Sequence, residues 1–201
     1  SSLEFLLQYD LDMYKVASCN SNKHVMLRQF AQRIPQNKTV VVSCAGRTLK
    51  EIDEVVEIFQ NHNMIINHCV AEYPCRKSNL RLGNINVLKE RYQSDKIEIG
   101  YSGHEEGILP TYGAIISGAT CIERHFCLSR HSFVHHIECS LEPAEYKEMV
   151  ATVRNNSISS NLSDIIGLEC FGVGFGMTDM EESFLVKNTY GADYVKEKTE
   201  I

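Results

Sequence analysis

Five short apolar runs, separated by segments with helical spacing, constrain the fold of this 201-residue chain more than any other feature. The runs are nearly continuous rather than alternating, which is typical of parallel strands that are buried on both faces. We predict strands in the runs MYKVAS (13–18), TVVVSC (39–44), MIINHC (64–69), IEIGYS (97–102) and TCIERHF (120–126).

The segments between these runs have the periodicity of amphipathic helices. In the segment 48–59 the apolar residues fall on one helix face, and Thr48 and Glu51 have the spacing of a capping box. Similar spacing predicts further helices at 24–34, 84–92, 107–117 and 143–153. Because strands and helices alternate along the chain, we expect a parallel sheet with helices packed against it.

Such a sheet can close in two ways, as an open doubly wound sheet or as a (β/α)8 barrel. Five strands are too few to close a barrel, which takes eight strands and usually about 250 residues. The first residues, SSLEFLLQYD, have the pattern of a helix. In a (β/α)8 barrel such a helix follows a strand. We therefore predict an α/β fold of TIM-barrel type (β/α) units, a partial barrel with about five of eight strands. Residues 1–154 are expected to form the barrel portion, and residues 155–201 a linker and a divergent C-terminal tail.

Composition excludes several classes of protein. The formal net charge is −6 with only 20 Lys and Arg and no basic tract, which disfavours nucleic acid as a partner. The apolar runs are too short to span a bilayer, so no membrane partner is expected. The eight cysteines form no Cys-x-x-Cys pair, and the first residues lack the features of a signal peptide. We therefore predict reduced, mostly buried thiols and a cytoplasmic location.

Polar side chains gather where the predicted strands end. In parallel α/β folds, functional residues collect beyond the carboxyl ends of the strands. The residues at these ends include a lysine, several hydroxyl groups and two imidazoles, a combination that predicts a cup for a phosphorylated anion beside a divalent metal. Two neutral imidazoles would leave the remaining metal positions to water or substrate oxygens. The strand ends also offer His68, Tyr101, Glu123 and Arg124. The candidates for this cup are Lys15, Ser18, Ser43, Tyr73, Ser102, His104 and His125.

Each candidate also has a purely structural interpretation. Strand-end histidines often only form hydrogen bonds, a strand-end lysine can reach solvent, and small hydroxyl residues commonly end strands. His68, inside an apolar run, fits a core histidine better than a ligand. Glu123 and Arg124 fit either an internal ion pair or catalytic groups. A cysteine nucleophile ranks low, because no histidine is visibly dedicated to activating one. Three loop histidines are interpreted as a solvated surface rather than a second metal site: His131, His135 and His136.

Six motifs together resemble those of the sialic acid synthase family. They follow the family's order and approximate spacing over residues 1 to about 154: YKVAS, VVVSC, HCVAEYP with NL, IGYSGHEEG, IERHF and SLEPAEY. The resemblance implies a transferase with a (β/α)8 barrel that condenses phosphoenolpyruvate with an N-acetylated hexosamine, typically N-acetylmannosamine. The product is a nine-carbon sialic acid, and phosphate is released. The implied cofactor is a divalent metal, Mn²⁺ first, with Mg²⁺ and Co²⁺ as alternatives.

The resemblance also implies a role for each candidate. The metal ligands fall on His104 and His125, which with Lys15 are the expected catalytic residues. Tyr73 matches a tyrosine that lines the sugar pocket. The residues that match contacts to phosphoenolpyruvate are Lys15, Ser18, Ser43 and Ser102.

The sugar half of the pattern departs from the family more than the phosphate and metal half. Asn20 replaces an acidic residue, Ala71 replaces a polar one, and His136 aligns with an expected Asp. Early barrel strands and a C-terminal antifreeze-like domain are not recognisable. Alternatives therefore stay open: a catalytically inactive barrel fragment that acts as a binding or assembly partner, or a related synthase that uses another aldose. Because a five-strand arc exposes its edges, we expect a homo-oligomer or a chain that supplies the missing strands.

Overall fold

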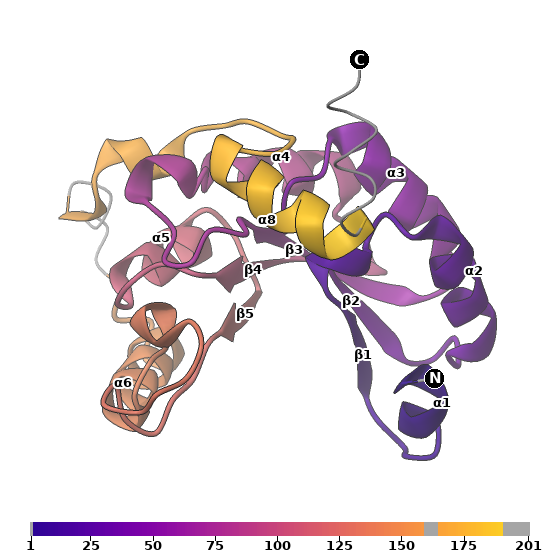
Figure 1. Ribbon diagram of the computed structural model, residues 1–201, viewed down its shortest axis with the longest axis horizontal. Coiled ribbons are helices and arrows are strands. Elements are labelled where there is room, and N and C mark those ends of the chain that lie inside the picture. The colour runs from indigo at the N-terminus through magenta and orange to yellow at the C-terminus, as the bar shows by residue number, and fades with distance from the viewer. Residues whose placement is uncertain (1, 159–164, 191–201) are drawn as a thin grey trace.

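The structure is a computed structural model that describes residues 2–158 and 165–190 (Figure 1). Its centre is one sheet of five parallel strands that follow one another in chain order. The strands are β1 (Met13–Val16), β2 (Thr39–Ser43), β3 (Asn63–Cys69), β4 (Ile97–Gly103) and β5 (Cys121–Arg124). The sheet curves into half of a barrel with helices on its convex side, so the predicted partial barrel of TIM-barrel type is confirmed.

The helices occupy the predicted places. Four of them connect successive strands: α2 (His24–Arg33), α3 (Leu49–Ile58), α4 (Gly83–Tyr92) and α5 (Leu109–Ile116). The others are α1 (Ser2–Leu6), α6 (Pro143–Arg154) and α8 (Asp179–Tyr190), with short 3-10 helices η1 (Ser18–Asn20), η2 (Lys77–Asn79), η3 (Ile137–Cys139) and η4 (Leu168–Phe171). The predicted capping box starts α3: the Thr48 hydroxyl accepts from the Glu51 amide at 3.3 Å, and the Glu51 carboxylate accepts from the Thr48 amide at 2.8 Å.

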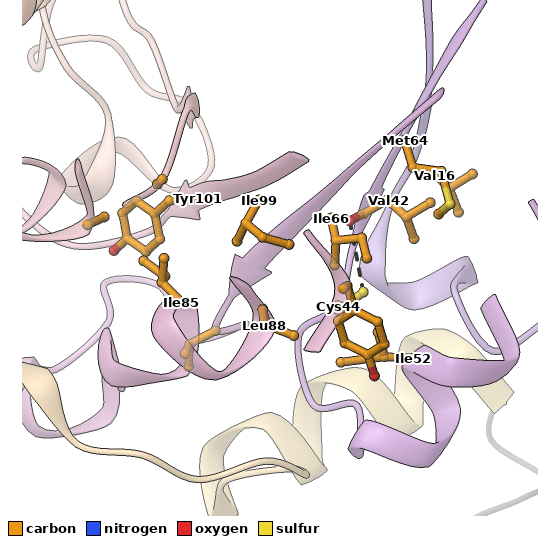
Figure 2. Packing of buried hydrophobic residues seen from close by; sticks show 14 of the residues in the cluster. Val16, Val42, Cys44, Ile52, Met64, Ile66, Ile85, Leu88, Ile99 and Tyr101 are labelled. Carbon is orange, nitrogen blue, oxygen red and sulfur yellow. Dashed lines mark hydrogen bonds between the residues drawn. The ribbon is translucent and has the colours of Figure 1, made fainter. Parts of the chain in front are cut away.

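Successive side chains on a strand point to opposite sides, so each strand contributes to both faces of the sheet. One set points outward against the helices and forms the hydrophobic core, where Ile66 and Ile99 are each 1% exposed (Figure 2). Burying an isoleucine or leucine of this size stabilises the fold by about 1.5–3 kcal/mol. The other set points into the concave side, where polar side chains are free to serve a site.

Residues that follow the barrel helices also pack against it. Ile166 and Cys170 belong to the main core, and the Leu82 amide donates to the Cys170 carbonyl at 2.8 Å. The division of the chain at residue 154 stays a prediction, and residues 159–164 and 191–201 of the predicted tail lie outside the described residues.

The assembly of the chain and its cellular location stay predictions. Within the described residues β1 and β5 each have a single neighbouring strand, and the expected oligomer or partner chain is untested. In the part of the chain that the structure covers, we find no helix with the length and apolar content needed to cross a membrane. The cytoplasmic location is likewise untested.

His68 is a core histidine, as its place in an apolar run predicts. It is 5% exposed, it lies 6.1 Å from the Tyr101 ring, and its Nε2 is 2.7 Å from the Leu80 carbonyl. Because a carbonyl oxygen only accepts, Nε2 carries the hydrogen. Burial lowers the pKa of His68 to about 4, since the charged ring would be desolvated.

This depressed pKa predicts a loss of stability in mild acid. Below pH 6.5 the unfolded chain takes up a proton at His68, whereas the folded chain does so only near pH 4. Between pH 7 and pH 4.5 the free energy of unfolding should therefore fall by about 2–3 kcal/mol more in the native chain than in His68→Gln. Urea unfolding at both pH values measures this difference, and parallel pH profiles for the two chains would contradict it.

Candidate active site

A cavity of about 330 Å³ opens at the carboxyl ends of the strands. All of the residues predicted from the sequence line it: Lys15, Ser18, Ser43, Tyr73, Ser102, His104 and His125. A larger groove of about 580 Å³ between α2 and α3 contains none of them. The predicted convergence is therefore present, while the chemical role of each residue stays a prediction.

Glu123 is the centre of the polar part of this cavity. Its carboxylate lies 3.2 Å from the Lys15 ammonium and accepts from the Ser102 hydroxyl at 3.0 Å and from the Asn67 amide at 3.5 Å. It thus gathers donors from β1, β3 and β4. Glu123 and Arg124 do not pair with each other, because neighbours on a strand point to opposite faces. Each has another ionic partner: Glu123 meets Lys15 in the cavity, and Arg124 meets Glu105 at 2.8 Å on the other face. Glu123 lies two residues before His125, and residues two apart on a strand point to the same face. This spacing is the sequence signal that could have placed Glu123 in the cavity.

Two buried polar atoms on the inner face lack protein partners. The Ser43 hydroxyl and the Asn67 side-chain oxygen are inaccessible and accept or donate no hydrogen bond within the described part of the chain. Ser43 and Asn67 are register partners on β2 and β3. Leaving such a group unsatisfied costs about 1–3 kcal/mol, so a small local shift that lets water or a ligand reach these atoms would be favoured.

The two imidazoles lie next to each other in the wall of the cavity. The ring centroids of His104 and His125 are 5.2 Å apart, with the planes at 81°. Nδ1 of His104 lies 2.6 Å from the Val70 carbonyl, so Nδ1 carries the hydrogen and Nε2 keeps its lone pair. Burial lowers the pKa of His104 to about 3, and burial together with His136 also lowers the pKa of His125. Both rings are neutral at physiological pH and can donate a lone pair to a metal.

The residues present fit an open metal site rather than a closed one. Across the described residues no group of three or more His, Cys, Asp or Glu side chains is arranged to hold an ion. A divalent cation would therefore take two imidazole ligands and fill its other positions with water or substrate oxygens. The sulfur of Cys69 lies 3.9 Å from Nδ1 of His104, the nitrogen that is already bonded to Val70. Burial raises the pKa of this thiol to about 12, which argues against a thiolate nucleophile or ligand.

A buried ion pair fixes the backbone that carries both histidines. Arg124 precedes His125 and Glu105 follows His104, and the two side chains meet at 2.8 Å with 0% and 2% exposure. The Glu105 carboxylate also accepts from the Tyr101 hydroxyl at 2.7 Å and from the Thr111 hydroxyl at 2.7 Å. Arg124 donates in addition to the backbone carbonyls of residues 105, 107 and 139. The ends of β4 and β5 are thus held together just behind the imidazoles.

An aromatic group forms the other side of the cavity. The Tyr73 ring lies 4.1 Å from His104, 4.1 Å from His136 and 5.2 Å from Phe184. The interpretation of the loop histidines as a solvated surface is therefore wrong for His136, which is half-buried against Tyr73 and lies 5.6 Å from His125. Sequence reasoning also missed Phe184, because it comes from the C-terminal segment, where no motif marks it.

The buried pair should be far more important to stability than an exposed one. Removing one partner leaves an uncompensated buried charge, so Glu105→Ala is expected to lower the free energy of unfolding by about 3–5 kcal/mol. The matched control is Asp10→Ala, which breaks the pair of the exposed Asp10 with Lys38 (N–O distance 2.6 Å) and should cost about 1 kcal/mol or less. Urea unfolding gives both values; similar losses in the two variants would contradict the assigned importance of the pair.

Comparisons with known proteins identify the family. A profile of the NeuB family matches residues 1–163. N-acetylneuraminate-9-phosphate synthase from Drosophila melanogaster is 32% identical over 162 residues, covering 79% of this chain and 42% of that protein. Pseudaminic acid synthase from Campylobacter jejuni strain 81-176 is 33% identical over 155 residues, covering 76% and 43%.

A solved structure agrees with these relatives. The N-acetylneuraminic acid (sialic acid) synthetase of Leptospira borgpetersenii, in complex with citrate, superimposes with a TM-score of 0.71 at 27% identity, covering 93% of this chain and 61% of that one. The chain spans less than half the length of the curated relatives that it matches. The match over residues 1–163 shows that the chain belongs to the NeuB family.

Proposed function

We propose that the cavity takes part in the condensation of phosphoenolpyruvate with an N-acetylated hexosamine, N-acetylmannosamine or a close analogue, to give a nonulosonic (sialic) acid and phosphate. The observation that carries the proposal is the convergence of one lysine, three serines, one tyrosine and two neutral imidazoles on a single cavity. Relatives named as synthases of N-acetylneuraminate 9-phosphate and of pseudaminic acid support this class of product.

The reaction joins two carbon atoms and releases one phosphate. C3 of phosphoenolpyruvate forms a bond with the aldehyde carbon of the open-chain sugar, water adds at C2, and the C2–O bond to phosphate breaks. The side chains of the cavity hold phosphoenolpyruvate in place. Its phosphate and carboxylate groups accept hydrogen bonds from one ammonium and two hydroxyl groups, those of Lys15, Ser43 and Ser102. Holding both reactants in one orientation replaces a bimolecular encounter and can lower the barrier by several kcal/mol.

A divalent cation fits the other half of the site. We assign Nε2 of His104 and the ring of His125 as its ligands, with Mn²⁺ as the first candidate and Mg²⁺ or Co²⁺ as alternatives. When bound there, the ion supplies Lewis-acid polarisation of an acceptor oxygen. The hydrogen bond from Nδ1 of His104 to Val70 keeps this ring in the tautomer that a ligand requires.

The Glu123 carboxylate is bonded to the same donors that phosphoenolpyruvate would use. Lys15 and Ser102 are both bonded to its carboxylate. The side chains of Lys15 and Glu123 are 34% and 45% exposed, so solvent screens the pair and it is worth about 0–1 kcal/mol. An incoming phosphate or carboxylate can displace Glu123 at little cost. We therefore assign Glu123 the task of keeping these donors oriented until the anion binds.

Phosphate release tests the proposed reaction. The chain is incubated with phosphoenolpyruvate, N-acetylmannosamine and Mn²⁺, and inorganic phosphate is measured. We expect release that depends on both substrates, with His104→Ala and His125→Ala each at least a hundredfold slower and at least tenfold weaker in Mn²⁺ affinity. The exposed His135→Ala is the control and should behave as the native chain. Binding of phosphoenolpyruvate without release with any hexosamine would contradict the proposal and favour a non-catalytic binding role.

The assignment of Glu123 predicts a gain of affinity. In Glu123→Gln the charge that competes with the anion is gone, so phosphoenolpyruvate should bind about three- to tenfold more tightly in metal-free buffer. Titration calorimetry measures this. The control is Glu98→Gln, which removes the same charge near the start of the neighbouring strand β4. Weaker binding in Glu123→Gln would show that the carboxylate helps the anion rather than competing with it.

A further inference from the structure

The C-terminal helix α8 supplies one side of the cavity. Phe184 and Leu185 line it together with residues from the strand ends. Figure 1 shows α8, in yellow, crossing the open end of the half-barrel in front of β3. Leu185 forms a small apolar cluster with Ala45, Cys69 and Ala71, which follow or end β2 and β3. A segment without an expected role thus lies directly against the predicted site.

A buried carboxylate attaches α8 to the end of β3. Glu181 is 1% exposed, and one of its oxygens accepts from the Ala71 amide at 2.9 Å. The other oxygen accepts from the Thr178 amide at 2.9 Å, while the Thr178 hydroxyl accepts from the Glu181 amide at 3.2 Å. Glu181 therefore both caps the first turn of α8 and bonds it to the segment that follows β3. Ala71 lies two residues before Tyr73, so this bond also fixes the start of the aromatic side.

The chain leading into α8 is held at several points. The Gly174 backbone exchanges two hydrogen bonds with the Asn84 side chain, each at 2.8 Å, and the Gly176 amide donates to the Arg47 carbonyl at 3.0 Å. Gly46 leaves the space that the helix needs. A Cβ at this position would lie 2.6 Å from the Leu185 side chain, and its φ of +68° is a conformation that favours glycine. These contacts hold α8 and the segment before it against the strand ends, where they form one wall of the cavity.

The wall faces the part of the cavity that suits an uncharged reactant. The donors Lys15, Ser43 and Ser102 lie on the sheet, where a multiply charged enolpyruvyl phosphate would bind. The Phe184 ring stands 5.2 Å from Tyr73, so this side offers carbon surface rather than charge. A neutral amino sugar can place its C–H groups and acetyl methyl on such rings.

We propose that residues 177–185 form the acceptor-side wall of the cavity, with Phe184 and Leu185 as specificity-determining residues for the hexosamine and Glu181 as the positioning residue that fixes them. The sugar selectivity rests on the proposed function, whereas the wall itself does not.

Two measurements separate these parts. The first is the rate at which iodoacetamide alkylates Cys69, followed by peptide mass spectrometry, because Leu185 packs on this thiol. Leu185→Ala and Glu181→Gln should each alkylate Cys69 at least tenfold faster than the native chain. The control is Met180→Ala on the same helix, at a side chain that is 49% exposed, and it should change nothing.

The second measurement is calorimetric binding of N-acetylmannosamine and of phosphoenolpyruvate, each with Mn²⁺. Phe184→Ala should weaken sugar binding at least fivefold and leave phosphoenolpyruvate within twofold. In steady-state assays Glu181→Gln should raise KM for the sugar with kcat within about threefold.

Each outcome tests either the wall or the sugar selectivity. Unchanged alkylation of Cys69 in both Leu185→Ala and Glu181→Gln would overturn the wall. Faster alkylation with sugar affinity unchanged in Phe184→Ala, or with equal loss for both ligands, would overturn the selectivity. A native chain that binds phosphoenolpyruvate but no hexosamine would overturn the selectivity together with the proposed acceptor, while the alkylation rates would still decide the wall.

Discussion

The site depends on the buried ion pair between Arg124 and Glu105. Each partner is the immediate neighbour of one imidazole, so the pair fixes the spacing of His104 and His125 through two backbones rather than through the rings. Its hydrogen bonds to Tyr101, Thr111 and backbone carbonyls compensate the desolvation of both charges. Because the pair lies on the outer side of the sheet, it leaves the inner side free for ligands.

The alternation of side chains along each strand divides structural from chemical residues. On β5, Arg124 points outward into the ion pair while Glu123 points into the cavity, and His125, the residue after β5, lines the cavity as well. On β4, Tyr101 supports Glu105 while Ser102 faces Glu123. A shift of one residue in the register of either strand would exchange these roles. Stability and chemistry are thus specified by neighbouring residues of the same short runs.

The sequence was sufficient for the sheet and for most of the cavity. Nearly continuous apolar runs predict buried parallel strands. Parallel strands bring their carboxyl ends to one edge of the sheet, so Lys15 and His125 are expected to line one cavity, as they do. It was not sufficient for contacts made by residues outside that pattern. His136 reaches Tyr73 through a loop in which its own φ is +59°, and Phe184 reaches it from a helix after the last barrel motif. Such contacts depend on tertiary packing, which no local periodicity encodes.

We propose that the imidazoles of His104 and His125 share one divalent cation. An anomalous-scattering map from crystals of this chain soaked with Mn²⁺ tests that claim most directly. It should show a single strong peak within about 2.0–2.3 Å of Nε2 of His104 and of one ring nitrogen of His125. A peak on one ring only, or metal bound elsewhere while both rings stay free, would contradict it.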